Sequence, residues 1–231
     1  MSTVGKTIKL SIEEHGLGRR HAPDERDQAY MLAPPKRTER THRSWYDNGW
    51  WGDQGATPMC VGYAWAHYIE DSPVTHPKAG AQVQPEFLYH AAQLVDEWPG
   101  TDYEGTSVRA GAKALQKMGI IGEYLWAPDM AAIAKTVLEQ GPVIMGTDWY
   151  NSMFEPDSKG RLSLDTSSGI AGGHAYVVNG YNVWTNLFRI KNSWSRSWGI
   201  KGHALIHADD LGRLLAADGE ACMTKEIEIV K

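Results

Sequence analysis

The stretch of sequence that decides the fold is QGATPMCVGYAW, residues 54–65. Within it, Thr57 and Pro58 precede an apolar segment, and a hydroxyl followed by proline is typical of a helix N-terminus. The spacing predicts a helix over 60–70 with Cys60 in its first turn. Unpaired N–H groups and the helix dipole favour a negative charge there, so we expect a lowered pKa and a reactive thiolate at Cys60.

Two later blocks supply the partners that a nucleophilic thiol needs. GGHAYVV, residues 172–178, places His174 at the start of an apolar strand after a glycine pair. IKNSW, residues 190–194, carries Asn192. A Cys-His-Asn set in this chain order corresponds to a nucleophile, its proton partner and an orienting amide. For a lone cysteine, a buried packing role is the alternative interpretation.

The remaining pattern places helices before strands. Helical spacing and start signals predict further helices over 85–98, 106–118 and 130–140. Apolar and alternating runs predict strands over 143–147, 174–181, 187–192, 203–207 and 226–230. This order indicates an α+β protein in two lobes. We expect an extended arm over 1–48, a helical lobe with the nucleophile over 49–130, and a β-rich lobe with His174 and Asn192 over 131–231.

Composition argues against several other classes of protein. The chain has 231 residues, a formal net charge of −5 and two cysteines. This charge disfavours broad binding to nucleic acid, and the apolar runs fall short of the roughly 18–20 residues of a membrane span. Two cysteines cannot form a disulfide framework, and no secretory leader pattern follows Met1. We therefore expect free thiols in a reducing compartment.

Several other polar residues are assigned no chemistry. His203 and His207 could share one strand face, but a third metal ligand is lacking nearby, so we expect no metal and no cofactor. Cys222 has neither a helix start before it nor a histidine downstream of it. It is expected to be a buried packing thiol. Arg19 and Arg20 belong to the polar arm and are expected to be solvated.

Together these blocks resemble the papain-like cysteine peptidases. The matching residues are Gln54, Gly55, Cys60, Trp65, Gly173, His174, Ala175, Lys191, Asn192, Ser193, Trp194, Trp198 and Gly199. PEFLY (85–89) and EGTS (104–107) also resemble family landmarks. The resemblance implies a papain-like two-lobe fold, with a helical N-terminal lobe, an antiparallel β-barrel-like C-terminal lobe and the active site in the cleft between them.

The chain departs from the secreted members of that family near the nucleophile. Thr57 stands where those members carry the cysteine of a disulfide. The arm does not resemble their helical inhibitory prosegment, whereas PDERDQAY (23–30) is similar to the leader of microbial members. The resemblance therefore suggests a microbial or phage-type enzyme without disulfides, and we expect it to be cytoplasmic or associated with a phage or virion.

The resemblance implies a role for each matching residue of the catalytic set. Cys60 would be the nucleophile, paired with His174 as thiolate and imidazolium, and Asn192 would hold the imidazole. Gln54 and the backbone N–H of Cys60 would form the oxyanion hole. Trp194 would shield the bond between His174 and Asn192 from water.

The resemblance also implies a peptide-binding groove between the lobes. Glu104-Gly105-Thr106 would pair with the backbone of an extended peptide. Gly146, Gly172 and Gly173 would border the pocket for the residue before the scissile one. Trp198 would flank the leaving-group side.

Three functional classes remain open at this point. The favoured class is a cysteine peptidase that hydrolyses peptide bonds of a peptide or protein through a thioester acyl-enzyme. The second keeps the same machinery for cell-wall peptide or isopeptide bonds. The third is a non-catalytic homologue used for binding, which the intact set of Cys60, His174, Asn192 and Gln54 disfavours.

Overall fold

The helical part of the fold is organised around α2, Cys60–Glu70, in the computed structural model. The structure describes residues 14–33, 36, 38–47, 49–71, 73 and 84–225. Every residue of α2 is buried, and α3 (Pro85–Gln93) and α4 (Val108–Lys117) pack around it. Close approach requires glycine: a Cβ on Gly62 would lie 2.2 Å from the carbonyl oxygen of Pro85.

The strands form one antiparallel sheet with the order β2-β7-β3-β4-β5-β6, and β1 pairs with β4. Their bounds are β1 His42–Ser44, β2 Glu123–Trp126, β3 Val143–Tyr150, β4 Ile170–Asn182, β5 Leu187–Lys191, β6 His203–His207 and β7 Glu220–Lys225. The remaining helices are α5 Met130–Glu139 and α6 Ala208–Ala216, with the 3-10 turns η1 Glu25–Tyr30, η3 Asn151–Met153 and η4 Thr166–Ser168.

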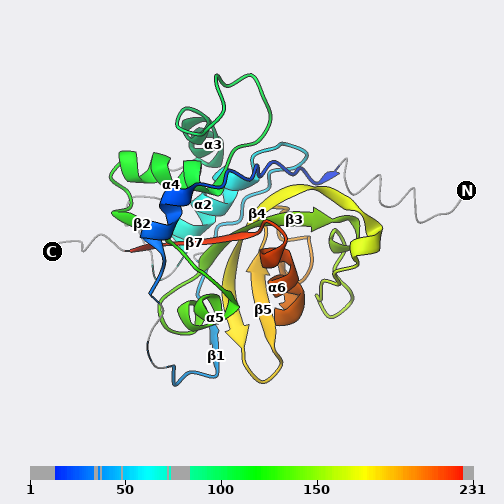
Figure 1. The fold of residues 1–231 in the computed structure, drawn as a ribbon. Helices are drawn as coiled ribbons and strands as arrows, with labels where there is room; N and C mark the ends of the chain where they lie inside the picture. The colour runs from blue at the N-terminus through cyan, green and yellow to red at the C-terminus, as the bar shows by residue number, and fades with distance from the viewer. Residues whose placement is uncertain are drawn as a thin grey trace, which may run out of the picture.

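The central strands are buried on both faces. Ile144, Ala175 and Val177 point into one core with α2 and α4, whereas their chain neighbours Met145 and Tyr176 point into a second core. The second core includes side chains of α5 and α6. Alternation of side chains along a strand divides the two sets. Figure 1 shows α2, α3 and α4 on one side of the molecule and α5 and α6 on the other.

The predicted α+β order is confirmed, and several boundaries differ from the prediction. The helix over 60–70 and the strand over 203–207 have their predicted bounds. The helix predicted over 85–98 ends at Gln93. Beyond that residue, the Asp96 carboxylate accepts hydrogen bonds from Tyr103 and Thr106 and organises a loop instead.

Other elements were missed or fall elsewhere. Sequence patterns did not predict β1, β2, β7 or α6, and the strand expected over 226–230 lies outside the described residues. Thr57 does not cap α2. Its hydroxyl donates to the carbonyl oxygen of Gln54 at 2.6 Å, and the N-cap residue Met59 makes no side-chain capping bond.

The N-terminal arm passes through the middle of the molecule. In Figure 1 its dark blue trace runs between α3 and α4 above and β3 and β4 below. Thr106 and Gly173 contribute backbone hydrogen bonds to it from these two sides. The prediction that Arg19 is solvated is wrong, because its side chain is 2% exposed. The predicted division of the chain at residues 48 and 130 stays a prediction.

Candidate active site

His174 and Asn192 lie side by side at the ends of neighbouring strands. His174 belongs to β4, and Asn192 directly follows β5, which pairs with β4. The imidazole Nε2 lies 2.8 Å from the side-chain oxygen Oδ1 of Asn192. That oxygen also accepts the backbone N–H of Ser193 at 2.7 Å. Because an N–H can only donate, Asn192 presents its oxygen, and the proton of a neutral His174 resides on Nε2.

This arrangement leaves the other imidazole nitrogen available. Nδ1 of His174 is buried and, among the described residues, has no hydrogen-bond partner. A neutral imidazole with Nε2–H carries its lone pair on Nδ1. His174 can therefore accept a proton at Nδ1 while Asn192 holds the opposite side of the ring.

Cys60 begins α2 and is fully buried. Burial raises the pKa of its thiol to about 12, against the opposing effect of the backbone N–H groups of Ala175, Val61 and Gly18. Ala175 follows His174 in the chain, so the thiol lies beside the strand that carries the imidazole. The predicted lowering of the Cys60 pKa is wrong for this arrangement, because desolvation outweighs the helix N-terminus.

His174 is shifted toward its neutral form as well. Burial lowers its pKa to about 4, although the bond to Asn192 acts in the opposite direction and His15 adds to the lowering. Neutral thiol and neutral imidazole are therefore favoured with the arm in place. The thiolate–imidazolium pair expected from sequence requires a more solvated arrangement.

Gln54 is held close to the start of α2. Its backbone N–H donates to the carbonyl oxygen of Ser193 at 2.8 Å, which ties it to the Asn192 segment. Its side-chain Nε2 donates to the carbonyl oxygens of Thr57 and Gly16, both at 2.9 Å. The side-chain N–H of Gln54, which is predicted to bind an oxyanion, thus already donates to the carbonyl oxygen of Gly16 in the arm.

Trp194 covers the imidazole. The rings of His174 and Trp194 stack with centroids 4.7 Å apart, and Trp194 is 2% exposed. The ring of His15, a residue of the arm, also stacks on Trp194, with the ring centroids 4.6 Å apart. Trp198 is buried, and its ring centroid lies 5.5 Å from that of Trp194. Its indole N–H donates to the carbonyl oxygen of Phe154 at 2.7 Å. We therefore assign Trp198 a packing role, and its contact with substrate stays a prediction.

The arm segment HGLGRR, residues 15–20, fills the groove beside these residues. Gly18 donates its N–H to the carbonyl oxygen of Gly173 at 3.0 Å, and its own carbonyl oxygen accepts the N–H of Thr106 at 3.0 Å. Arg20 donates its N–H to the carbonyl oxygen of Thr106 at 2.8 Å. A Cβ on Gly18 would lie 1.9 Å from the carbonyl oxygen of Pro58, so only glycine fits there.

The residues predicted to bind substrate line this same groove. Gly105 and Thr106 form one wall, where a Cβ on Gly105 would lie 2.3 Å from the carbonyl oxygen of Gly18. Gly146, Gly172 and Gly173 form the other wall, against the side chains or backbone of Leu17 and Arg19. The structure thus brings the predicted groove residues together around the arm.

Sequence reasoning missed the arm as an occupant of the groove and missed Glu220 at one end of it. Arg19 donates its Nε–H to Oε1 of Glu220 at 2.9 Å. The signal that could have indicated the arm is the pair of glycines at 16 and 18 directly before two arginines. Glycines at alternate positions allow close backbone approach to a surface.

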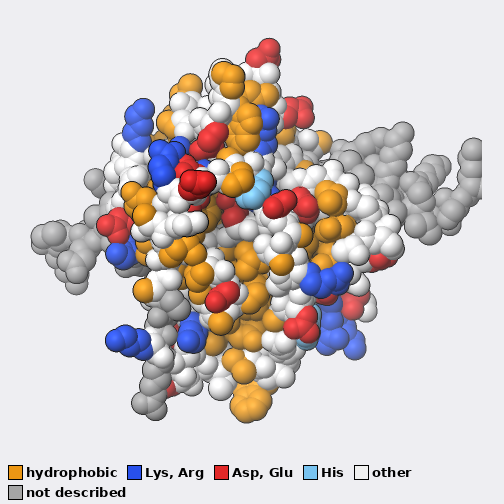
Figure 2. Space-filling model, in the orientation of Figure 1, with side chains coloured by type: hydrophobic (Ala, Val, Ile, Leu, Met, Phe, Trp, Pro, Cys, Tyr) orange, Lys and Arg blue, Asp and Glu red, His pale blue; other side chains and the backbone are white. Residues whose placement is uncertain are grey.

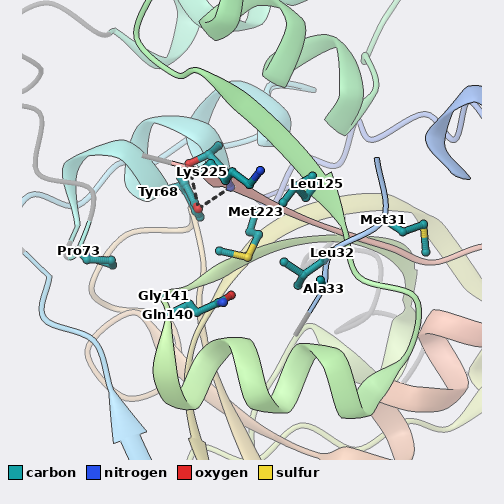
Figure 3. A pocket seen from close by; sticks show the side chains of 11 residues that line it. Met31, Leu32, Ala33, Tyr68, Pro73, Leu125, Gln140, Gly141, Met223 and Lys225 are labelled. Atoms are coloured by element: carbon teal, nitrogen blue, oxygen red, sulfur yellow. Dashed lines mark hydrogen bonds between the residues drawn. The ribbon is translucent and has the colours of Figure 1, made fainter. Parts of the chain in front are cut away.

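A separate pocket of about 340 Å³ lies away from this groove (Figure 3). It is formed by Met31 and Leu32 of the arm, Tyr68 of α2, Leu125 of β2 and Met223 of β7, among others. Tyr68 accepts the backbone N–H of Thr224 at its edge, at 2.9 Å. The described residues that line it include no Cys, His, Asp or Glu.

The other polar residues singled out in the sequence lie apart from the groove. His203 packs edge-on against Trp51 at 4.7 Å, whereas His207 accepts the N–H of Asp209 at the start of α6. Cys222 is buried. In the part of the chain that the structure describes, no cluster of three or more His, Cys, Asp or Glu could hold a metal ion.

Comparison with known proteins identifies the family. The papain family cysteine proteases match residues 81–223, a region that contains His174 and Asn192 and begins after Cys60. This match covers more than half of the chain. The chain belongs to the papain family of cysteine proteases.

Sequence similarity links the chain to curated proteins. An uncharacterized peptidase C1-like protein of Acanthamoeba polyphaga mimivirus is 23% identical over 65% of the chain, and Testin-2 of Mus musculus is 24% identical over 60%. The chain spans 62% and 44% of the lengths of these two curated relatives.

Solved structures show the same fold. Xylellain, a cysteine protease from Xylella fastidiosa, is 18% identical with a TM-score of 0.72, over 93% of this chain and 98% of that one. The proform of the ragweed pollen cysteine protease Amb a 11 is 15% identical with a TM-score of 0.67, over 97% of this chain and 79% of that one. The predicted papain-like two-lobe fold is confirmed.

Proposed function

We propose that the chain is a cysteine peptidase that hydrolyses peptide bonds through Cys60, His174, Asn192 and Gln54. The observation that carries this proposal is the 2.8 Å bond between His174 Nε2 and Asn192 Oδ1, with Nδ1 left unpartnered among the described residues. The backbone N–H next to this histidine, that of Ala175, approaches the thiol of Cys60. These contacts support the assignment of Cys60 as the nucleophile, His174 as the base and Asn192 as the orienting amide.

The reaction would proceed in two steps. The sulfur of Cys60 attacks the carbonyl carbon of the scissile amide, and the thiol proton passes to Nδ1 of His174. The tetrahedral intermediate expels the amine, which leaves with the proton held by His174, and a thioester remains. Water then attacks the thioester while His174 accepts its proton, and Cys60 is released as the thiol.

Gln54 and Asn192 would act on the charges that develop. The side-chain N–H of Gln54, now on the carbonyl oxygen of Gly16, would stabilise the oxyanion of each tetrahedral intermediate. Asn192 would keep the imidazole oriented without cancelling the charge of the imidazolium. Trp194, stacked on the ring, would exclude water from that bond.

With residues 15–20 in the groove, the arm would hold the enzyme in a closed form. His15 lies on Trp194, next to the expected leaving-group side, and the chain then runs past Gly16 toward Thr106. A substrate would run the other way, because its N-terminal residues belong to the acyl side. The arm therefore presents no correctly oriented amide to Cys60 and must leave before substrate binds.

The substrate assigned by this proposal is a peptide or protein. No observation favours cell-wall peptide or isopeptide bonds, and that alternative is not proposed. In the described part of the chain, the structure contains no helix suited by length and hydrophobicity to span a bilayer. Figure 2 shows acidic and basic side chains interspersed on one face of the molecule. A cytoplasmic or virion-associated location stays a prediction.

A thiol-reactive peptidyl epoxide tests the proposal. Mass spectrometry should find it on Cys60 of the folded chain, together with turnover of a protein substrate. Cys60→Ala and His174→Ala should each abolish turnover, whereas the matched control Cys222→Ala should retain it. Full turnover by His174→Ala would contradict the assignment of the base.

A further inference from the structure

The side chain of Arg19 occupies a pocket that is shaped around a guanidinium. Its Nε–H donates to Oε1 of Glu220 at 2.9 Å and its Nη2 donates to the carbonyl oxygen of Asp218 at 2.7 Å. A Cβ on Gly146 would lie 2.9 Å from both Arg19 Nε and Glu220 Oε1, so glycine makes room for the pair. Two acceptors at one guanidinium provide the fork geometry that distinguishes arginine from lysine.

Glu220 is a buried carboxylate that depends on this partner. It begins β7 opposite Gly146 of β3, and its side chain is 10% exposed. Within the described residues, the hydrogen-bond donor to its carboxylate is Arg19. Arg109 adds positive charge nearby, but its guanidinium is engaged by Asp27 and Glu97. Departure of the arm would open this site and leave the Glu220 carboxylate and the carbonyl oxygen of Asp218 as acceptors for another guanidinium.

The next residue of the arm occupies a second site for a cation. The guanidinium of Arg20 lies 4.0 Å from the ring centre of Trp98 and 4.8 Å from that of Tyr103. The backbone N–H of Arg20 pairs with Thr106. Aromatic faces attract cations through their quadrupole. Both sites lie on the Thr106 side of Cys60, away from Trp194, which is the acyl side expected for a substrate.

We propose that the groove selects peptides with two consecutive basic residues on the acyl side of the scissile bond, an inference that rests on the proposed function. The residue nearer the scissile bond, preferably arginine, binds Glu220 and the carbonyl of Asp218. The residue before it lies on Trp98 and Tyr103. Arg19 and Arg20 of the arm occupy the same two sites in the closed form, with the opposite chain direction.

Labelling rates of Cys60 in the full chain test this specificity. The probes are short peptides that end in an acyloxymethyl ketone and carry Arg, Lys, norleucine or Glu at the position that faces Glu220. We expect the Arg probe to label Cys60 about 10–100-fold faster than the norleucine probe, since a charged hydrogen bond is gained. Lys should fall between them and Glu should be slowest.

Substitutions assign the preference to the named residues. Glu220→Gln should bring the ratio of Arg to norleucine rates close to one, whereas Glu123→Gln, at an exposed carboxylate, should leave the ratio unchanged. The ratio is used because loss of the Arg19 partner also loosens the arm and changes all rates together. Trp98→Leu should lower the gain from a second basic residue by about 2–5-fold.

Arg19→Ala keeps the inference testable if Glu220→Gln does not fold. With Glu220 intact and the internal arginine absent, the preference for the Arg probe should persist or increase. Equal rates for Arg and norleucine in the wild type, or a preference that survives Glu220→Gln, would overturn the specificity. Absence of any labelling, in Arg19→Ala as well, would contradict the proposed function instead.

Discussion

The side-chain amide of Gln54 donates to the carbonyl oxygen of Gly16 at 2.9 Å, so the arm occupies the donor that an oxyanion would need. Two residues later, Gly18 lies so close to the start of α2 that a Cβ would come within 1.9 Å of the carbonyl oxygen of Pro58. Closure of the groove thus depends on glycine at this position. Any side chain there would displace the arm, because the opposing atom is backbone and cannot move aside.

Gly18→Val should therefore open the groove. We expect the rate of Cys60 alkylation by iodoacetamide to rise about tenfold or more, because the thiol becomes solvated and its pKa falls from the raised value. Gly212→Ala, on α6 and away from the groove, serves as the matched control and should leave the rate unchanged. An unchanged rate in a folded Gly18→Val protein would show that the arm does not control access to Cys60.

Gln54→Ala should lower kcat about 100–1,000-fold, as removal of one oxyanion donor does elsewhere. Its effect on KM should be small, because the donor acts on charge that develops in the transition state. Steady-state kinetics after the arm has been displaced measures both constants. Gln116→Ala is the control and should leave kcat unchanged. Gln116 lies on the exposed side of α4, where its side chain donates to the carbonyl oxygen of Gly122.

Local patterns sufficed for part of the elements that carry the proposed catalytic residues. The helix over 60–70 follows from spacing and from the Thr57-Pro58 signal. The strand predicted over 174–181 lies within β4, but β4 begins earlier, at Ile170, and includes the glycine pair that was expected to precede it. The correct helix start nevertheless had the wrong cause, because Thr57 binds Gln54 rather than the helix N-terminus. The helix is held by burial of all its residues instead, which a sequence pattern expresses only as hydrophobicity.

The occupied groove could not be predicted because its contacts leave little trace in local sequence. Gly16 and Gly18 bind through backbone atoms, whose chemistry is the same in every residue. Arg19 meets Glu220 across a separation of 201 positions, and no periodicity links the two. Charge in a polar arm favours solvation, and tertiary burial of the pair reversed that expectation.

Acid should destabilise the fold through histidines that are buried or half-buried. The pKa values of five of them are lowered by burial: His15, His21, His67, His174 and His203. For His174 the pKa falls from 6.5 to about 4, so between these values the unfolded chain binds more protons than the folded one. The free energy of unfolding therefore decreases as pH falls from 6.5 to 4, by about 3 kcal/mol for His174 alone.

Urea unfolding at pH 7, 5.5 and 4.5 measures this dependence. His174→Gln should make the free energy of unfolding decrease less between pH 7 and pH 4.5. His42→Gln, at an exposed position of β1, should leave the decrease as in the wild type. A free energy of unfolding that stays constant across this range would refute the role of the buried imidazoles.

Tyr89 should support the substrate-binding wall without taking part in chemistry. Its hydroxyl accepts the backbone N–H of Gly105 at 2.9 Å and the side-chain N–H of Gln93 at 3.1 Å, and both donors are buried. Tyr89→Phe leaves them without this acceptor, so the free energy of unfolding should fall by about 1–3 kcal/mol. KM should rise several-fold with kcat nearly unchanged, because the wall that pairs with peptide loosens while Cys60 and His174 keep their places. Tyr30→Phe, which changes a half-exposed ring of η1, is the control and should leave KM and kcat unchanged. A loss confined to kcat in Tyr89→Phe would contradict a supporting role for Tyr89.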